Sequence, residues 1–244
     1  MSNLKYLIVY HKEDNDGVLS AAIFMDYLIK KSVDSTDINM CGYTYGELMN
    51  EDINKWNQIY DHIIMLDISF NDYKKMIQLK KDFGKNFCWI DHHSPIIVES
   101  IFRKFDDING VRQTDRSTIL LKYKYLYDPF DEKYHNKTCP ELFRILSAYD
   151  SWTYEQEGYH FDEVDNINKA VTFESELDIR NMMKYINIDN ATEDSEIKRL
   201  EKIGSLLTDY DRFRYKRLIS DYEDVWRIDN GDGTFLNCSV LFTQ

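Results

Sequence analysis

Three short apolar runs in this sequence each end in side chains that can bind a metal ion or exchange a proton. The side chains are His11, Asp14 and Asp16 after residues 4–10, Asp67 after residues 62–66, and Asp91, His92 and His93 after residues 87–90. Like charges placed this close together repel one another unless water, a helix N-terminus or a cation neutralises them. Mixed imidazole and carboxylate groups are suited to divalent transition metals. The residue types therefore indicate metal-assisted chemistry.

The apolar runs alternate with segments of helical periodicity through the first hundred residues. Such alternation favours a Rossmann-like α/β fold, with a mostly parallel sheet and helices on both faces. The ligand site of an open α/β sheet lies beyond the carboxyl ends of its strands. If the strands are neighbours, the three groups of side chains face one crevice. Strands are expected at residues 4–10, 38–43, 62–66 and 87–90, and helices at residues 17–30, 47–56 and 71–83.

A simpler interpretation exists for each of these side chains taken alone. A single aspartate after a strand is usually a helix cap, and Asp16 is well placed near the start of the helix expected at residues 17–30. Three such groups in succession, two of which contain histidine, favour a functional site. His62, His135 and His160 have no such neighbours, so we expect them to be structural or exposed.

Beyond residue 100 the pattern becomes mostly helical. Asp150 follows one of the expected helices, and a turn signal at Asn230-Gly231-Asp232-Gly233 predicts a short C-terminal β-hairpin. We expect a catalytic domain at residues 1–185 and a connecting helix at residues 186–220. Residues 221–244 would then be the start of a second domain or a hairpin added to the first. The helices are expected at residues 117–127, 139–148, 177–186 and 193–218, and the hairpin at residues 224–242.

Composition limits the classes of function. The 244 residues carry a net charge of −13, which argues against broad binding to long nucleic acids but not against a short fragment held by metal and a few basic side chains. No apolar run approaches the roughly 18 residues of a transmembrane helix, and the charged start argues against a signal peptide. The cysteines are widely scattered, so we expect reduced thiols in a cytoplasmic protein. They are Cys41, Cys88, Cys139 and Cys238.

Four stretches of this sequence, in this order, resemble the motifs of the DHH phosphoesterase superfamily. They are HKEDNDG at residues 11–17, MLDIS at 65–69, WIDHHS at 89–94 and SAYDSW at 147–152. The superfamily contains single-strand exonucleases, nano-RNA and phosphoadenosine phosphatases, cyclic-dinucleotide phosphodiesterases and family II inorganic pyrophosphatases. The resemblance covers roughly residues 4 to 155 and is greatest to the branch that acts on nano-RNA and oligonucleotides. The first motif, with two residues between His11 and Asp14, is one residue shorter than in many members.

The resemblance implies a site with two divalent ions about 4 Å apart that activate a water molecule. The donor set suits Mn²⁺ best, with Mg²⁺ or Co²⁺ as other occupants. Asp67 would bridge the ions, Asp91 would orient a neighbouring group, and His93 would contact the substrate phosphate. The first ion would be held by His11, Asp14 and Asp67, and the second by Asp16, Asp67, His92 and Asp150. The catalytic residues would be Asp67, Asp91, His92 and His93, and further phosphate contacts would come from Arg112, Arg116 and Ser117.

The leading hypothesis is a metal-dependent phosphoesterase acting on short oligonucleotides or small nucleotides. The alternatives are a hydrolase of pyrophosphate or polyphosphate, and a nucleotide-binding module without activity. Residues 237–239 resemble the entry to a substrate-binding, DHHA1-like domain, but no glycine-rich motif of that domain follows. The chain is therefore either the catalytic part of a longer protein or naturally short. A homodimer is compatible with the sequence, and no membrane partner is expected.

Overall fold

The computed structural model describes residues 4–93, 108–126, 139–188, 190–221, 225–229 and 235–239. Its centre is a four-stranded sheet in which every neighbouring pair of strands is parallel, as the sequence predicted. Tyr10 lies opposite Leu66, and Leu66 lies opposite Ile90, so the strands end level with one another. The spatial order is β2 (Ile38–Tyr43), β1 (Tyr6–His11), β3 (His62–Leu66) and β4 (Phe87–Ile90).

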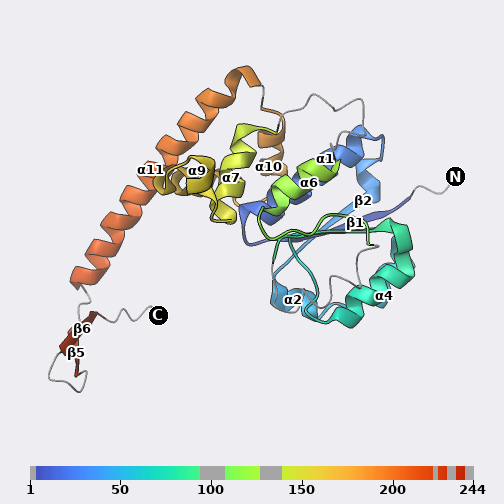
Figure 1. Cartoon of the computed structure of the whole chain (residues 1–244), viewed down its shortest axis with the longest axis horizontal. Coiled ribbons are helices and arrows are strands. Elements are labelled where there is room, and N and C mark those ends of the chain that lie inside the picture. The colour runs from blue at the N-terminus through green and yellow to red at the C-terminus, as the bar shows by residue number, and fades with distance from the viewer. Residues whose placement is uncertain are drawn as a thin grey trace.

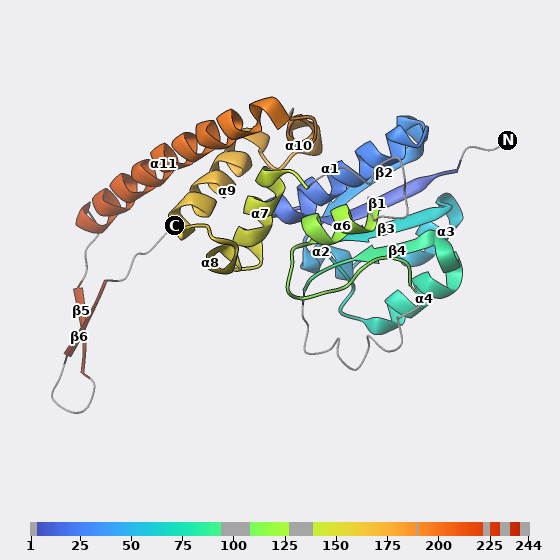
Figure 2. The same ribbon diagram turned by 45° about the horizontal axis from the view of Figure 1, so that its top comes forward.

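Alternate residues of each strand face opposite sides of the sheet and build two cores. Ile8 and Ile64 pack with α1 and α6, whereas Leu7 and Ile63 pack with α2, α3 and α4. Figure 2 shows these two helical layers on either side of the strands. The first layer contains α1 (Asn15–Lys30) and α6 (Thr118–Leu126), and the second contains α2 (Tyr45–Met49), α3 (Ile53–Ile59) and α4 (Tyr73–Phe83).

A helical region follows the sheet and packs beside α1. Its longest helix, α11, lies so close to α9 that a Cβ at Gly204 would be 1.8 Å from the Asn166 carbonyl oxygen. Figure 1 shows α11 continuing past α9 and away from the sheet. The helices are α7 (Glu141–Asp150), α8 (Tyr154–Glu157), α9 (Phe161–Ser175), α10 (Ile179–Ile186) and α11 (Asn190–Asp221).

The C-terminal hairpin predicted from the sequence is present. Strands β5 (Val225–Asp229) and β6 (Phe235–Ser239) pair antiparallel, with Val225 opposite Ser239. The turn predicted at residues 230–233 lies outside the described residues. The boundaries between the catalytic domain, the connecting helix and the hairpin stay a prediction.

Two of the sequence-based expectations for helices need correction. The single helix expected at residues 47–56 is divided into α2 and α3, because Asp52 caps a new helix by accepting a hydrogen bond from Asn54 N at 3.1 Å. Helices α8 and α9 were not expected. The buried face of α9 consists mainly of Val164, Ile167 and Val171 among many polar residues, so its periodicity is weak. None of the helices in the described ranges combines the length and the apolar character needed to cross a lipid bilayer.

Candidate metal centre

The loop between β1 and α1 holds His11 and Asp14 next to each other. Asp14 is the N-cap residue of α1, and its Oδ1 accepts a hydrogen bond from Gly17 N at 2.9 Å. Its Oδ2 lies 2.8 Å from His11 Nδ1. A Cβ at Gly17 would lie 2.1 Å from the His11 carbonyl oxygen, so only glycine lets α1 begin this close to β1. Asp14, and not Asp16, therefore caps α1.

Asp16 instead caps a helix that is distant in sequence. Its two carboxylate oxygens accept hydrogen bonds from Thr118 N and Ile119 N, both at 2.8 Å, at the start of α6. Asp16 is almost completely buried. The positive N-terminal end of α6 stabilises its charge, and the pairing fixes α6 against the β1–α1 loop.

Asp67 lies at the end of β3 and is completely buried. Its φ of 60° is in the left-handed region, which aspartate adopts more readily than most residues. Its N–H donates to the Ile90 carbonyl oxygen at 3.0 Å, and its Oδ1 accepts a hydrogen bond from Thr118 Oγ1 at 3.0 Å. Its Oδ2 has no hydrogen-bond partner in the described part of the chain. Unusual backbone geometry of this kind is concentrated at functional sites.

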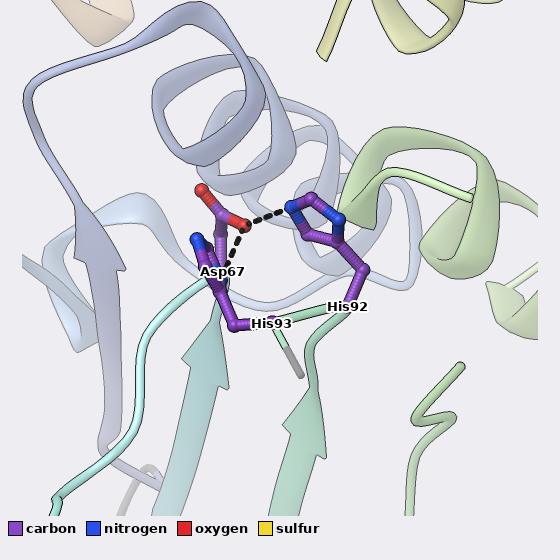
Figure 3. Close-up of side chains that lie close together, drawn as sticks. All are labelled: Asp67, His92 and His93. Atoms are coloured by element: carbon purple, nitrogen blue, oxygen red, sulfur yellow. Dashed lines mark ion pairs between the residues drawn. The ribbon is translucent and has the colours of Figure 1, made fainter. Parts of the chain in front are cut away.

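The two histidines that follow β4 converge on Asp67 (Figure 3). His92 Nε2 lies 3.3 Å and His93 Nδ1 lies 3.5 Å from Asp67 Oδ1. The ring of His93 is also held by Asp91, whose Oδ1 lies 2.9 Å from His93 Nδ1. The other oxygen of Asp91 accepts a hydrogen bond from Trp89 Nε1 at 3.1 Å. Asp91 thus orients His93, in the position in which the sequence predicted an orienting carboxylate.

Asp150, the last residue of α7, also lies beside His92. Its Oδ2 lies 3.1 Å from His92 Nε2, which is also 3.5 Å from Asp16 Oδ2. Asp150 therefore links the helical region to the carboxyl edge of the sheet. An aspartate after a helix is a weak signal by itself, and the family resemblance implied Asp150 as a ligand of the second ion.

Side chains predicted as metal ligands form two groups, in each of which one donor atom per residue lies within 4.8 Å of the others. One group is His11, Asp14 and Asp67, and the other is Asp16, His92 and Asp150. A third group that meets the same limit, Asp67, His92 and His93, shares one member with each of them. Asp67 Oδ2, His92 Nε2 and Asp150 Oδ2 are buried and have no hydrogen-bond partner among the described residues. Because buried polar atoms without partners are rare and destabilising, these donors fit a bound cation.

Burial or nearby negative charges raise the pKa values of Asp150, Asp67 and His11 in the metal-free protein. Burial and the nearby charge of Asp16 raise the pKa of Asp150 to about 9. Burial and Asp16 likewise raise the pKa of Asp67 well above its usual range. The hydrogen bond to Asp14 and the nearby charge of Asp67 raise the pKa of His11 to about 10. Bound protons thus offset the negative charge of the site in the metal-free protein, and a metal ion would have to displace them.

Two residues of this region were not singled out from the sequence. Tyr45, at the start of α2, contacts the rings of both His11 and His93, with centroids 5.5 Å and 5.6 Å away. Its hydroxyl is buried and has no partner among the described residues. Lys122, in the helix expected to be amphipathic, is completely buried and donates to the Ser20 carbonyl oxygen at 2.7 Å. Neither position could be predicted, because an aromatic residue or a lysine in a helical pattern does not indicate which side chains it contacts or whether it is buried.

Three residues, Arg112, Arg116 and Ser117, were predicted from the sequence to contact the phosphate. Arg112 is held by the Trp89 and Ile108 carbonyl oxygens, at 2.9 Å and 3.0 Å, and it stacks on the Trp89 ring. It therefore anchors the segment after β4. Arg116 is exposed, and Ser117 is buried beside Asp16's partner Thr118. Phosphate contacts from these residues stay a prediction.

Comparison with known proteins gives one family match. The model of the DHH family, N-terminal domain, matches residues 5–148. No curated protein matches the sequence significantly.

Solved structures with a similar arrangement are distant in sequence. An uncharacterized protein from Helicobacter pylori G27 is 17% identical over 82% of this chain and 63% of its own, with a TM-score of 0.48. The exonuclease RecJ bound to manganese is 13% identical over 91% of this chain and 66% of its own, with a TM-score of 0.49. RecJ from Thermus thermophilus in complex with Mn²⁺ is 10% identical over 91% and 38%, with a TM-score of 0.46. The chain thus spans less than two thirds of each of these proteins.

Proposed function

The chain belongs to the DHH family, and on that premise we propose that it is a divalent-metal-dependent phosphoesterase. Its substrates are short oligonucleotides or small nucleotides, whose phosphodiester or phosphomonoester bonds it hydrolyses. When bound, a pair of divalent ions lowers the pKa of water and neutralises the charge on phosphate oxygens. Mixed histidine and aspartate ligands favour Mn²⁺, with Mg²⁺ and Co²⁺ as alternatives.

The position of Asp67 is the observation that carries this proposal. Its Oδ2 faces His11, at 3.7 Å from Nδ1, whereas its Oδ1 faces His92, at 3.3 Å from Nε2. Each oxygen thus lies close to a different histidine, one from each group of donors. This arrangement would let Asp67 contribute to binding an ion at either group, and Thr118 holds the carboxylate in place.

The remaining side chains are suited to binding the phosphate. His93 is partly exposed, and although burial lowers its pKa, the hydrogen bond to Asp91 gives a net rise. A protonated His93 attracts an anionic oxygen. Tyr45, whose ring contacts His11 and His93, offers a hydroxyl donor, and burial raises its pKa, so it keeps its proton. These two donors position the phosphate over the ligand groups.

The charge around the site favours phosphoesters over pyrophosphate. A phosphoanhydride carries more negative charge and needs several basic side chains at the site. Lys12, the basic residue next to His11, instead pairs with Glu47 at 2.6 Å, and Arg112 is engaged by backbone oxygens. A pyrophosphatase and a binding module without activity are therefore alternative outcomes of the test below.

A turnover panel with purified protein and Mn²⁺ tests the proposal. The panel contains an RNA dinucleotide, a longer single strand, a cyclic dinucleotide, phosphoadenosine phosphate and pyrophosphate, each with wild type and Asp67→Asn. We expect cleavage of one nucleotide class that is lost with chelator and in the variant. Phosphate release from pyrophosphate alone would replace the proposal with the anhydride hydrolase, and no turnover by Mn²⁺-loaded protein would replace it with the binding module.

A further inference from the structure

A set of aromatic rings, of which Trp152 and Phe161 are exposed, adjoins Asp150. The rings of Trp152 and Phe161 are parallel, with centroids 6.2 Å apart and an interplanar angle of 11°. The ring of Tyr149 lies 6.5 Å from that of Phe161, with an interplanar angle of 22°. Trp152 is 69% exposed, and its ring also lies 6.3 Å from that of Tyr154. We call Trp152, Phe161 and Tyr149 the aromatic stack.

The backbone holds Trp152 in an unfavourable conformation. Trp152 N donates to the Tyr149 carbonyl oxygen, and Thr153 N donates to that of Ala148, which is the Schellman pattern at the end of a helix. The residue after the C-cap in this pattern is left-handed and is usually glycine. Trp152 occupies that position with a φ of 57°. A bulky residue there is an outlier, and its mostly exposed ring gains little from the core in return.

The aromatic stack lies next to the metal centre. Trp152 follows Asp150 by two residues, so their Cα atoms are at most about 7.6 Å apart. Asp150 Oδ2 lies 3.1 Å from His92 Nε2. Figures 1 and 2 both show α7, which ends at Asp150, beside the carboxyl ends of the strands.

The charge around the aromatic stack excludes one class of ligand. The sequence contains no lysine or arginine between Arg144 and Lys169. Glu155, Glu157 and Asp162 are acidic and exposed in this stretch. Phosphates are therefore repelled here, whereas an uncharged planar group can stack on Trp152 without that penalty.

We propose that Trp152 is the stacking surface for a nucleobase of the substrate. This inference rests on the proposed function, since the phosphate attached to that nucleoside lies in the metal centre. Stacking on an aromatic ring tolerates any base, because every base has a π face. The acidic surroundings restrict the occupant to a nucleoside that carries no further phosphates on its outer side. The site thus favours the end of a short oligonucleotide or a mononucleotide.

Tryptophan fluorescence provides a test that does not depend on turnover. Trp56 and Trp89 are buried, so Trp152 is the accessible tryptophan among the described side chains. Adenosine 5′-monophosphate added to Mn²⁺-loaded protein should quench the emission, whereas inorganic phosphate should not. Trp152→Phe should remove the quenching but keep most of the affinity. Trp152→Ala should weaken binding of the nucleotide about 5- to 150-fold and leave binding of phosphate unchanged.

Phe173→Ala is the matched control, because Phe173 is 63% exposed on α9 and lies outside the aromatic stack. It should bind the nucleotide as wild type does. Equal affinity of Trp152→Ala and wild type, or equal quenching by phosphate and nucleotide, would overturn the inference. Binding that depends on Trp152 without hydrolysis of any substrate would contradict the proposed function alone. Hydrolysis with an unchanged KM in Trp152→Ala would contradict the stacking role alone.

Discussion

Tyr45 presents a buried hydroxyl that finds no acceptor within the described residues, and a substrate phosphate would provide one. Tyr45→Phe removes this donor without changing the ring that contacts His11 and His93. We expect kcat/KM to fall about 10- to 150-fold, which corresponds to one hydrogen bond to a charged group. Mn²⁺ affinity, measured by calorimetry, should not change.

Tyr43→Phe is the control for this prediction, because the Tyr43 hydroxyl interacts with Cys41 and Glu51 and not with the ligand groups. Its kcat/KM should equal that of wild type. Unchanged turnover in Tyr45→Phe, or a matching loss of Mn²⁺ affinity, would show that the hydroxyl does not contact substrate.

The raised pKa values of His11 and Asp150 predict how pH affects the metal-free protein. The folded state binds protons more tightly than the unfolded state, because the pKa of His11 is raised from its ordinary 6.5 to about 10 and that of Asp150 from its ordinary 3.8 to about 9. Stability from such groups is present at low pH and is lost as pH rises. We therefore expect Tm in chelator to fall between pH 6.5 and pH 9.

Mn²⁺ affinity should change in the opposite direction over the same range, because each ion must displace these protons. Calorimetry in buffers of different ionisation enthalpy should detect proton release at pH 6.5, and less of it at pH 9. An affinity that does not depend on pH would contradict the placement of both residues at the metal centre.

At the scale of elements, the junction of β1 and α1 leaves no room for a single added methyl group. Gly17→Ala would place Cβ 2.1 Å from the His11 carbonyl oxygen, so either the helix or His11 must move. We expect the free energy of unfolding to fall by about 1–3 kcal/mol and Mn²⁺ affinity to fall with it. Urea denaturation and calorimetry measure the two effects.

Gly46→Ala is the matched control in α2. Its Cβ would meet nothing closer than Thr44 Oγ1 at 3.8 Å, so the change should be neutral or stabilise the protein by about 0.5–1 kcal/mol. Equal stability of Gly17→Ala and wild type would show that α1 does not depend on this close approach.

The strands could be predicted from the sequence because they are short apolar runs with polar residues at both ends. Residues 38–43, 62–66 and 87–90 have the boundaries that the pattern gave. The side chains at strand ends could be grouped for the same reason, since parallel strands end at one edge. Contacts between distant elements could not be predicted, such as Asp16 capping α6 or Arg112 anchoring to Trp89. Periodicity within a segment carries no information about such partners.

At the scale of the whole molecule, the proposed ions connect the sheet to the helical region, because Asp150 comes from α7 and His92 follows β4. Asn15 makes a second connection, by donating to the Asn168 side chain at 2.7 Å in α9. Mn²⁺ at 100 times its Kd should add about 2.7 kcal/mol, which raises Tm by about 5–10 °C. Thermal denaturation with and without Mn²⁺ measures this shift.

Asp150→Asn should reduce that shift while leaving the metal-free protein at least as stable at pH 8, since Asp150, with a pKa of about 9, must take up a proton on folding at this pH whereas the amide need not. Asp209→Asn, on the exposed part of α11, should keep the full shift. An equal rise in Tm with Mn²⁺ in both variants would show that Asp150 does not bind the metal.

Anomalous diffraction from crystals soaked in Mn²⁺ tests the central claim most directly, because it locates each ion without any assumption about substrate. We predict two peaks on opposite sides of the Asp67 carboxylate, one beside His11 and Asp14 and the other beside Asp16, His92 and Asp150. Both peaks should disappear or weaken strongly in Asp67→Asn. A single ion, or ions that do not contact Asp67 at saturating Mn²⁺, would contradict the bridged two-ion centre.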